Sequence, residues 1–195
     1  MSRIFVSSDF HFFHKNILKF NPSTRPWASV EEMNDALITN WNNVVASSDH
    51  VYNLGDFAFA GVSRQIDILE QLNGHHHLIR GNHDQMWRKQ QNIDKALAGN
   101  WFASIQDYIE LKYDHKTICM FHYAPRVWNK AHHGSYFLYG HSHGSLPGIG
   151  RSMDVGIDSS EMVSNGAPFL LDDVLAFLEP RQYLPIDHHN SETGQ

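Results

Sequence analysis

The first half of the chain alternates between short strand patterns and helical spacing. Residues 3–7 alternate apolar and polar and end in a polar corner, which predicts a half-buried strand. Ser29 and Glu32 have the spacing of a capping box and predict the start of an amphipathic helix. The expected buried stripe of that helix contains Val30, Met33, Leu37, Trp41 and Val44 or Val45. The remaining predicted elements are strands at 50–54 and 77–79 and a helix at 62–72, stopped by Asn73-Gly74.

The second half has mostly strand patterns. Strands are predicted at 108–113, 116–122, 135–139 and 153–157, followed by a closing helix at 172–178. Alternation of strands and helices followed by strands predicts an α/β or α+β layered fold with a substantial sheet. The sequence shows no repeat or composition break, so one domain is expected over 1–182. The polar stretch after Pro180 predicts a flexible tail over 183–195.

Composition excludes several classes of protein. A hydrophobic fraction of 42% and a charged fraction of 18% over 195 residues are typical of a globular domain. Cys119 is the only cysteine, so no internal disulfide forms and a reducing compartment suits the chain. No apolar run reaches the roughly 20 residues of a membrane span, and the first residues lack the apolar core of a signal peptide. These observations predict a cytoplasmic protein.

Charge and histidine content narrow the choice of ligand. The net charge of −6, without clustered Lys and Arg, favours a small phosphate ester over a long nucleic acid. The chain has 15 histidines, some of which lie in predicted loops or near the C-terminus. We interpret these as solvated polar residues or weak adventitious metal ligands. They are His75, His76, His77, His132, His133, His188 and His189.

Five polar clusters share one position, because each follows a predicted strand. Loops at the ends of sheet strands are where a scaffold gathers functional groups from distant parts of a chain. The clusters offer oxygen and imidazole nitrogen but no thiolate, which suits Mn, Fe, Zn, Co or Ni better than Mg. Each cluster is a weak signal alone, whereas the ordered set is specific. The set is Asp9-Phe10-His11, Gly55-Asp56, Gly81-Asn82-His83-Asp84, His122 and Gly140-His141-Ser142-His143.

This ordered set resembles the calcineurin-like metallophosphoesterase superfamily from Arg3 to about Leu178. Stretches 8–16, 41–59 and 138–144 also resemble its small bacterial and phage members. The resemblance implies a four-layered αββα sandwich with two divalent metal ions, most readily Mn. It implies that one metal is held by Asp9, His11, Asp56 and His143. It implies that the second is held by Asp56, Asn82, His122 and His141, with Asp56 shared, and that His83 is catalytic rather than a ligand.

These residue types suit hydrolysis of a phosphate ester. Two cations about 3.5–4 Å apart need an anion between them, and the carboxylate of Asp56 supplies it. A bridging water then loses its proton near neutral pH and attacks as hydroxide, while the net positive charge stabilises the phosphate. His83 is the candidate general acid for the leaving alkoxide. Asp84 is expected either to orient His83 or its loop, or to serve only the turn.

Substrate contacts and substrate class are less constrained. Arg126 is either a bidentate phosphate clamp or a solvated surface residue. Asn82 and His14 are further candidates for contact with the substrate. Asn16 and Arg25 are weaker candidates, supported only by their position in a loop near Asp9. A short chain leaves little material for a capping domain, which slightly favours a phosphodiester over a monoester. The alternatives are a metal-dependent nuclease and a non-catalytic interaction scaffold. The scaffold is disfavoured because His83 and a suitable residue at every ligand position are present.

Overall fold

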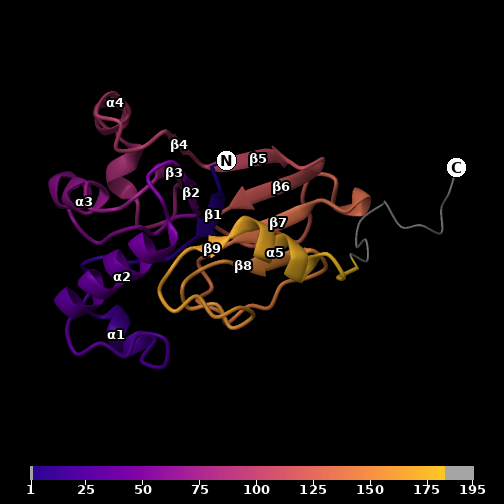
Figure 1. Ribbon diagram of the computed structural model, residues 1–195, viewed down its shortest axis with the longest axis horizontal. Helices are drawn as coiled ribbons and strands as arrows, with labels where there is room; N and C mark the ends of the chain where they lie inside the picture. The colour runs from indigo at the N-terminus through magenta and orange to yellow at the C-terminus, as the bar shows by residue number, and fades with distance from the viewer. Residues whose placement is uncertain (1, 183–195) are drawn as a thin grey trace, which may run out of the picture.

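The computed structural model describes residues 2–182 and contains two β-sheets packed face to face (Figure 1). The first sheet has the order β4-β3-β2-β1-β9. Its strands β1 to β4 are mutually parallel and β9 is antiparallel to β1. Parallel strands end at one edge of a sheet, so the loops after them share that edge. The strands are β1 (Ile4–Ser7), β2 (His50–Asn53), β3 (His75–Ile79), β4 (Ser104–Gln106) and β9 (Phe169–Leu170).

The second sheet has the order β5-β6-β7-β8. Strand β5 forms an antiparallel hairpin with β6, whereas β6, β7 and β8 are parallel. A parallel bridge between Ser8 and Gly156 joins the ends of β1 and β8. It thereby joins the edges of the two sheets at which the parallel strands end, which we call the loop edge. The strands are β5 (Tyr108–Tyr113), β6 (Lys116–Phe121), β7 (Tyr136–Tyr139) and β8 (Ser152–Asp154).

Helices cover the outer face of the first sheet, at the left of Figure 1. Their apolar residues form one core with the outward side chains of β1, β2 and β3. A second core lies between the sheets and includes Val6, Leu138 and residues of the last helix. Trp128 and Ala124 pack on Cys119 and Phe137 at the outer face of the second sheet. The helices are α1 (Ile17–Phe20), α2 (Val30–Val44), α3 (Val62–Leu69), α4 (Gln90–Ala98) and α5 (Leu171–Leu178), with 3₁₀ turns at Gln85–Arg88 and Ala131–His133.

The predicted α/β class, with sheets flanked by helices, is confirmed. The expected stripe of α2 is buried, and the Ser29 hydroxyl accepts a hydrogen bond from the Glu32 amide as a capping box requires. Four helices and strands were not predicted: α1, α4, β4 and β9. Helix α4 has no side-chain cap and a polar sequence, and the two strands span only three and two residues. Among residues 2–182, no helix is long and apolar enough to cross a membrane.

The interpretation of the triple-histidine run as a loop was wrong, and the strand predicted at 77–79, which already includes His77, begins two residues earlier. His75, His76 and His77 form the first three residues of β3 and pair in parallel with β2. His76 is buried beside Trp41, and burial lowers its pKa to about 4. The predicted tail, with His188 and His189, lies outside the described residues.

Candidate metal centre

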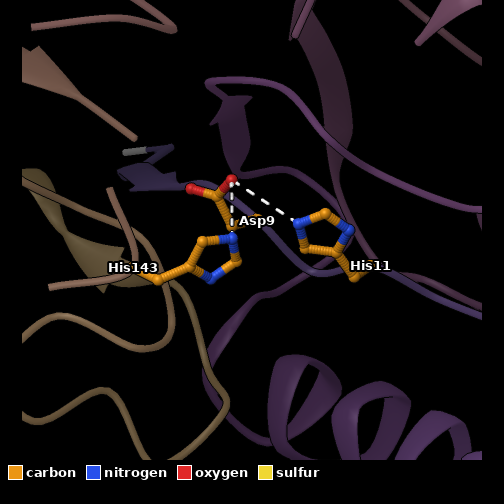
Figure 2. A group of neighbouring side chains, drawn as sticks. All are labelled: Asp9, His11 and His143. Atoms are coloured by element: carbon orange, nitrogen blue, oxygen red, sulfur yellow. Dashed lines mark ion pairs between the residues drawn. The ribbon is translucent and has the colours of Figure 1, made fainter. Parts of the chain in front are cut away.

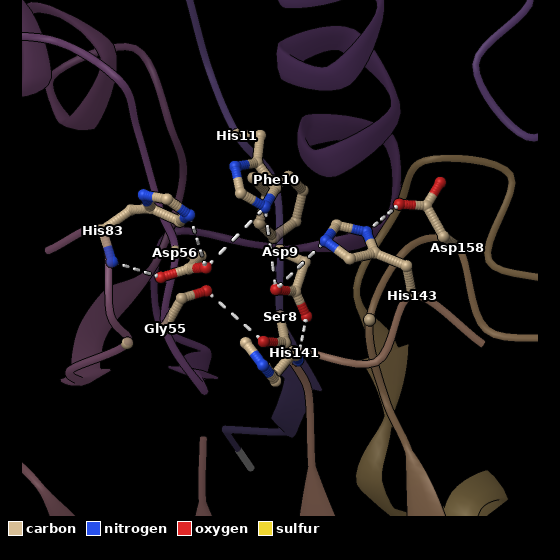
Figure 3. Close-up of polar contacts among 12 residues, drawn as sticks. Ser8, Asp9, Phe10, His11, Gly55, Asp56, His83, His141, His143 and Asp158 are labelled. Carbon is tan, nitrogen blue, oxygen red and sulfur yellow. Dashed lines mark hydrogen bonds and ion pairs between the residues drawn. The ribbon is translucent and has the colours of Figure 1, made fainter. Parts of the chain in front are cut away.

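The five predicted clusters meet at the loop edge shared by the two sheets. Asp9 and Asp56 follow β1 and β2, and their backbones are joined by a hydrogen bond from the Asp9 amide to the Gly55 carbonyl at 2.9 Å. His122 and His141 follow β6 and β7 of the other sheet. Figure 3 shows these loops converging on one small volume, with the carboxylates at its centre. The parallel topology therefore places side chains that are distant in sequence around a common point.

The first group of possible ligands is Asp9, His11 and His143, drawn in Figure 2. The Oδ1 atom of Asp9 lies 3.8 Å from Nε2 of His11 and 3.9 Å from Nε2 of His143. Asp9 and His11 are buried, and His143 is partly buried. One cation between these three atoms would have a carboxylate oxygen and two imidazole nitrogens as ligands.

The second group is Asp56, His122 and His141, and its outer side is open to solvent at His141. Nε2 of His122 lies 3.6 Å from Oδ2 of Asp56 and 3.1 Å from Oδ1 of Asn82. The other ring nitrogen of His122 donates to the Leu54 carbonyl at 2.7 Å, which leaves Nε2 as a free lone pair for a metal. This group therefore has the same donor types as the first, with an amide oxygen added.

Asp56 lies between the two groups. Its Oδ2 atom is 3.8 Å from Nε2 of His11 in the first group and 3.6 Å from Nε2 of His122 in the second. Its Oδ1 atom accepts a hydrogen bond from the His83 amide at 2.8 Å, which fixes the orientation of the carboxylate. Asp56 is thus placed where one carboxylate reaches both candidate metal positions.

The interior of the centre fits metal ions because its polar atoms have no partners within the described chain. Oδ1 of Asp9 and both ring nitrogens of His11 are buried without a hydrogen bond among residues 2–182. Unsatisfied buried polar atoms are costly, and a bound cation satisfies them. Burial raises the pKa of Asp9 to about 6 and lowers the pKa of His11, as expected when charged groups are desolvated without a counter-ion.

Backbone strain is concentrated at the same residues. Five of the seven candidate ligands have positive φ: Asp9, His11, Asp56, His141 and His143. Left-handed conformations of this kind cost of order 1 kcal/mol each and occur mostly at functional sites. Two glycines make room for the carboxylates, since a Cβ on Gly81 would collide with Asp56 and one on Gly140 with Ser8 and Asp9. The fold therefore retains a strained arrangement that packing alone does not require.

The most important residue missed by the sequence analysis is Asp158. Its Oδ2 atom accepts a hydrogen bond from Nδ1 of His143 at 2.7 Å, so Nε2 of His143 faces Asp9 (Figure 3). Burial lowers the pKa of His143, but this hydrogen bond and the charges of Asp9 and Asp158 outweigh burial and raise it. Asp158 directly follows the predicted strand 153–157, which is the signal shared by the five recognised clusters.

Arg25 is not a substrate contact, contrary to our weaker expectation. Its guanidinium is 1% exposed and forms an ion pair with Asp158 at 2.8 Å. It also donates to the carbonyls of Asp9 and Phe10. Arg25 therefore supports Asp158 and the backbone of the loop that contains Asp9. The position of Arg25 in a loop near Asp9 did not reveal this structural role.

Asp84 organises the loops around Asp56. Its buried carboxylate accepts backbone hydrogen bonds from Asp56, Phe57 and Gly81 at 2.7, 3.1 and 2.8 Å. Burial raises its pKa in spite of these hydrogen bonds. The carboxylate thus ties the loop after β2 to the loop after β3, and its bonds are to backbone amides rather than to the His83 ring.

His83 lies at the mouth of the centre. Its side chain is 42% exposed, and Nε2 is 3.9 Å from Oδ2 of Asp56. The ring packs against Phe59, with 4.4 Å between centroids, and Phe59 stacks on His14 at 3.9 Å. His14 is therefore part of an aromatic wall beside His83. The wall continues to the exposed ring of Phe20.

Arg126 and Asn16 lie outside this cluster of contacts. Arg126 is exposed and forms no hydrogen bond or ion pair with another residue of the described range 2–182. It lines a hollow of about 300 Å³ together with Tyr139, Leu146 and Ile149. Asn16 is exposed at the start of α1.

Two half-sites of Asp and His side chains, sharing one carboxylate at the joined edge of two sheets, define a candidate dinuclear metal centre. Residues 2–155 match the calcineurin-like phosphoesterase superfamily domain, and the chain belongs to this family. The family is metal-dependent, in agreement with the two ligand groups.

Individual relatives are similar to this chain over different lengths. An uncharacterized protein of Methanocaldococcus jannaschii is 46% identical over 96 residues, which cover 48% of this chain and 53% of that protein. The gene 66 protein of Mycobacterium phage D29 is 26% identical over 184 residues, covering 82% of this chain and 89% of that protein. The chain thus spans about half the length of the archaeal relative. A crystal structure of a protein of unknown function from Aquifex aeolicus has the same fold, with a TM-score of 0.66 and 22% identity over 89% of this chain and 98% of that one.

Proposed function

We propose that the chain is a hydrolase of small phosphate esters that uses two divalent metal ions, with Mn²⁺ the preferred metal and a phosphodiester the preferred substrate. The observation that carries the proposal is the position of Asp56, whose Oδ2 lies within 3.8 Å of ligand nitrogens from both half-sites. A shared carboxylate is the feature that two adjacent cations need. Family membership makes phosphoester hydrolysis the chemistry to test first.

The proposed ligands are Asp9, His11, Asp56 and His143 for one ion, and Asp56, Asn82, His122 and His141 for the other. Two bound cations would supply the positive charge that attracts a phosphate ester and the acidity that makes water a nucleophile at neutral pH. Asp158 and the Leu54 carbonyl hold the imidazoles of His143 and His122 with Nε2 facing the metal positions. Asp84 holds the backbone of Asp56 in its strained conformation.

His83 is proposed to donate the proton that the leaving alkoxide needs. Its Nε2 atom faces Asp56 and its ring is open to solvent, so a substrate on the metal side can reach it. Phe59 packs against the ring and limits its orientations. A protonated imidazole can deliver this proton to the leaving oxygen.

Exposure of the centre supports the diester preference. His83 and His141 are both solvent-exposed, and the described residues 2–182 include no separate domain above them. A diester carries a second substituent on phosphorus, and this open side leaves room for it. Arg126 is proposed as a secondary contact, because a guanidinium free of protein partners can bind a distal phosphate or carboxylate.

The test is turnover of matched monoesters and diesters by protein reconstituted with Mn²⁺. The panel contains p-nitrophenyl phosphate, bis-p-nitrophenyl phosphate, and the 3′-5′ and 2′,3′-cyclic nucleotides. We expect metal-dependent hydrolysis, with kcat/KM higher for diesters than for monoesters. Hydrolysis of monoesters alone would refute the diester preference. Cleavage confined to single- or double-stranded nucleic acid would favour the nuclease alternative, and metal binding without any turnover would favour the scaffold.

A further inference from the structure

A second group of histidines lies at the opposite ends of the strands that carry the metal centre. His50 begins β2, and His75 and His77 lie in the first half of β3. His50 is the register partner of His75, and Tyr52 is the partner of His77. Because side chains alternate along a strand, His50, His75 and His77 project from the same face of the sheet. We call these three residues the strand-start histidines.

Their rings are already in contact. Nδ1 of His50 lies 3.0 Å from Nε2 of His77, and the two rings are stacked with centroids 5.3 Å apart. The ring of His75 lies 5.0 Å from that of His50. Tyr52 stacks on His77 at 4.4 Å and supports its ring. The cluster is open on one side, since His75 is exposed and the rings of His50 and His77 are partly exposed.

The hydrogen bonds of His77 resemble those of a metal ligand. Its Nδ1 atom is 2.8 Å from the Ser104 hydroxyl, at the start of β4. A hydrogen bond from Nδ1–H of His77 to this oxygen leaves Nε2 with a lone pair directed at His50. Ligating histidines in metal sites are oriented by the same arrangement. The Ser104 hydroxyl can accept this hydrogen bond and is therefore compatible with the tautomer of His77 that binds a cation.

We propose that the strand-start histidines form a second metal site, separate from the catalytic pair, for a single Zn²⁺ or a similar nitrogen-seeking ion. Zn–N distances of about 2.0–2.1 Å in a tetrahedral site place two ligand nitrogens roughly 3.4 Å apart. The 3.0 Å separation of His50 and His77 is close to this value. The exposed ring of His75, 5.0 Å from that of His50, is the proposed third ligand and reaches the ion by rotation of its side chain, and solvent fills the fourth position.

Ion binding here needs no large rearrangement. The ion replaces the hydrogen that His50 and His77 share, and the proton on Nδ1 of His50 moves to its Nε2. The absence of a carboxylate ligand gives this site a preference for Zn²⁺ over Mn²⁺ or Mg²⁺, which the carboxylate-containing centre at the loop edge does not share.

The site is tested by counting zinc on tag-free, full-length protein. We expect wild type to bind one more equivalent of Zn²⁺ than the double variant His50→Gln/His77→Gln, in equilibrium dialysis with metal analysis. Ser104→Ala should keep the equivalent but weaken its binding by about 10- to 100-fold, as loss of an orienting partner does. The matched control is His115→Asn, an exposed histidine at a positive-φ turn outside the cluster, which should bind as wild type does.

Location is tested independently of any variant. Crystals of wild type soaked in zinc chloride should give an anomalous peak within bonding distance of Nδ1 of His50 and Nε2 of His77. No peak there, or equal zinc counts for wild type and the double variant, would overturn the proposal. The number of metal ions bound at the catalytic centre does not affect this result. Failure of the proposed function and failure of this second site are therefore distinguishable.

Discussion

Histidines lie near both ends of the parallel strands in the first sheet, but their hydrogen-bond partners and backbone conformations differ between the two ends. At the loop edge, His11, His122 and His143 surround carboxylates, and buried polar atoms there have no hydrogen-bond partner within residues 2–182. At the opposite end, His50 and His77 bond to each other and to Ser104 in regular strands. Asp9, His11, Asp56, His141 and His143 at the loop edge also have positive φ, whereas His50 and the three histidines of β3 do not. Unsatisfied atoms and a strained backbone, rather than the number of histidines, therefore distinguish the candidate catalytic centre.

The comparison also predicts different metals at the two ends. Carboxylates at the loop edge offset the charge of two adjacent cations and favour hard or borderline ions such as Mn²⁺. The neutral imidazoles at the strand starts suit a single Zn²⁺. Substitutions at one end should therefore leave metal binding at the other unchanged.

The largest effect is expected for Asp56→Asn at the loop edge. Loss of the shared anion leaves two cations without a charge between them, so manganese content should fall below two ions per chain and turnover should drop below detection. Metal analysis and diester hydrolysis measure this directly. Asp67→Asn, an exposed position on α3, is the matched control and should behave as wild type. Full occupancy with normal turnover in Asp56→Asn would contradict the bridging role.

His83→Ala separates catalysis from metal binding at the same edge. Removal of a general acid should slow kcat by roughly 10²–10⁴-fold while both metal ions remain bound. His143→Ala is the matched removal of an imidazole and should lose metal. If His83→Ala also loses metal, His83 is a ligand and its assignment as the acid is wrong.

Asp158→Asn tests whether the unpredicted carboxylate orients His143. We expect manganese affinity to fall by about 10- to 100-fold, because the imidazole loses the partner that fixes its tautomer. The substitution also leaves Arg25 buried without its counter-ion, which should destabilise the fold by about 3–5 kcal/mol.

Metal titration and urea unfolding separate these two effects of Asp158→Asn. Asp49→Asn is a useful control, since it removes a buried carboxylate from an Arg3 ion pair that lies at the starts of β1 and β2, opposite the manganese centre. It should lower stability without changing manganese affinity. Unchanged affinity in Asp158→Asn would reduce that residue to a purely structural role.

The smallest effect is expected at the strand-start end, for His76→Leu. The folded-state pKa of His76 is depressed to about 4 from 6.5, so the unfolded chain binds more protons between these values. The contribution of His76 to stability is therefore fully present above pH 6.5 and is lost as pH falls toward 4. The shift corresponds to at most about 3 kcal/mol.

Urea unfolding of metal-free protein at pH 5 and pH 8 measures this contribution. Wild type should lose more stability than His76→Leu between pH 8 and pH 5, whereas His115→Asn should follow wild type. Equal losses in wild type and His76→Leu would show that His76 is not buried in its neutral form.

The fold and the ligand groups were predictable to different degrees. Strong periodicity, as in Met33, Leu37 and Trp41 of α2, is local and was recognised in the sequence. The ligand clusters were recognisable because each follows a strand. Arg25 was misread because its buried pair with Asp158 is separated by 133 residues, which no local pattern encodes. Asp158 follows a predicted strand, as the recognised clusters do, and was missed because it is a single carboxylate whose role depends on that pair. His75 and His76 were assigned to a loop because their polar side chains obscured the start of a strand that pairing with β2 determines.

The most direct test of the central claim is anomalous diffraction from crystals soaked in manganese chloride. The account predicts two peaks about 3.5–4 Å apart, one bounded by Asp9, His11 and His143 and the other by His122, His141 and Asn82, with Asp56 bonded to both. One isolated peak, or two peaks that do not share Asp56, would contradict it.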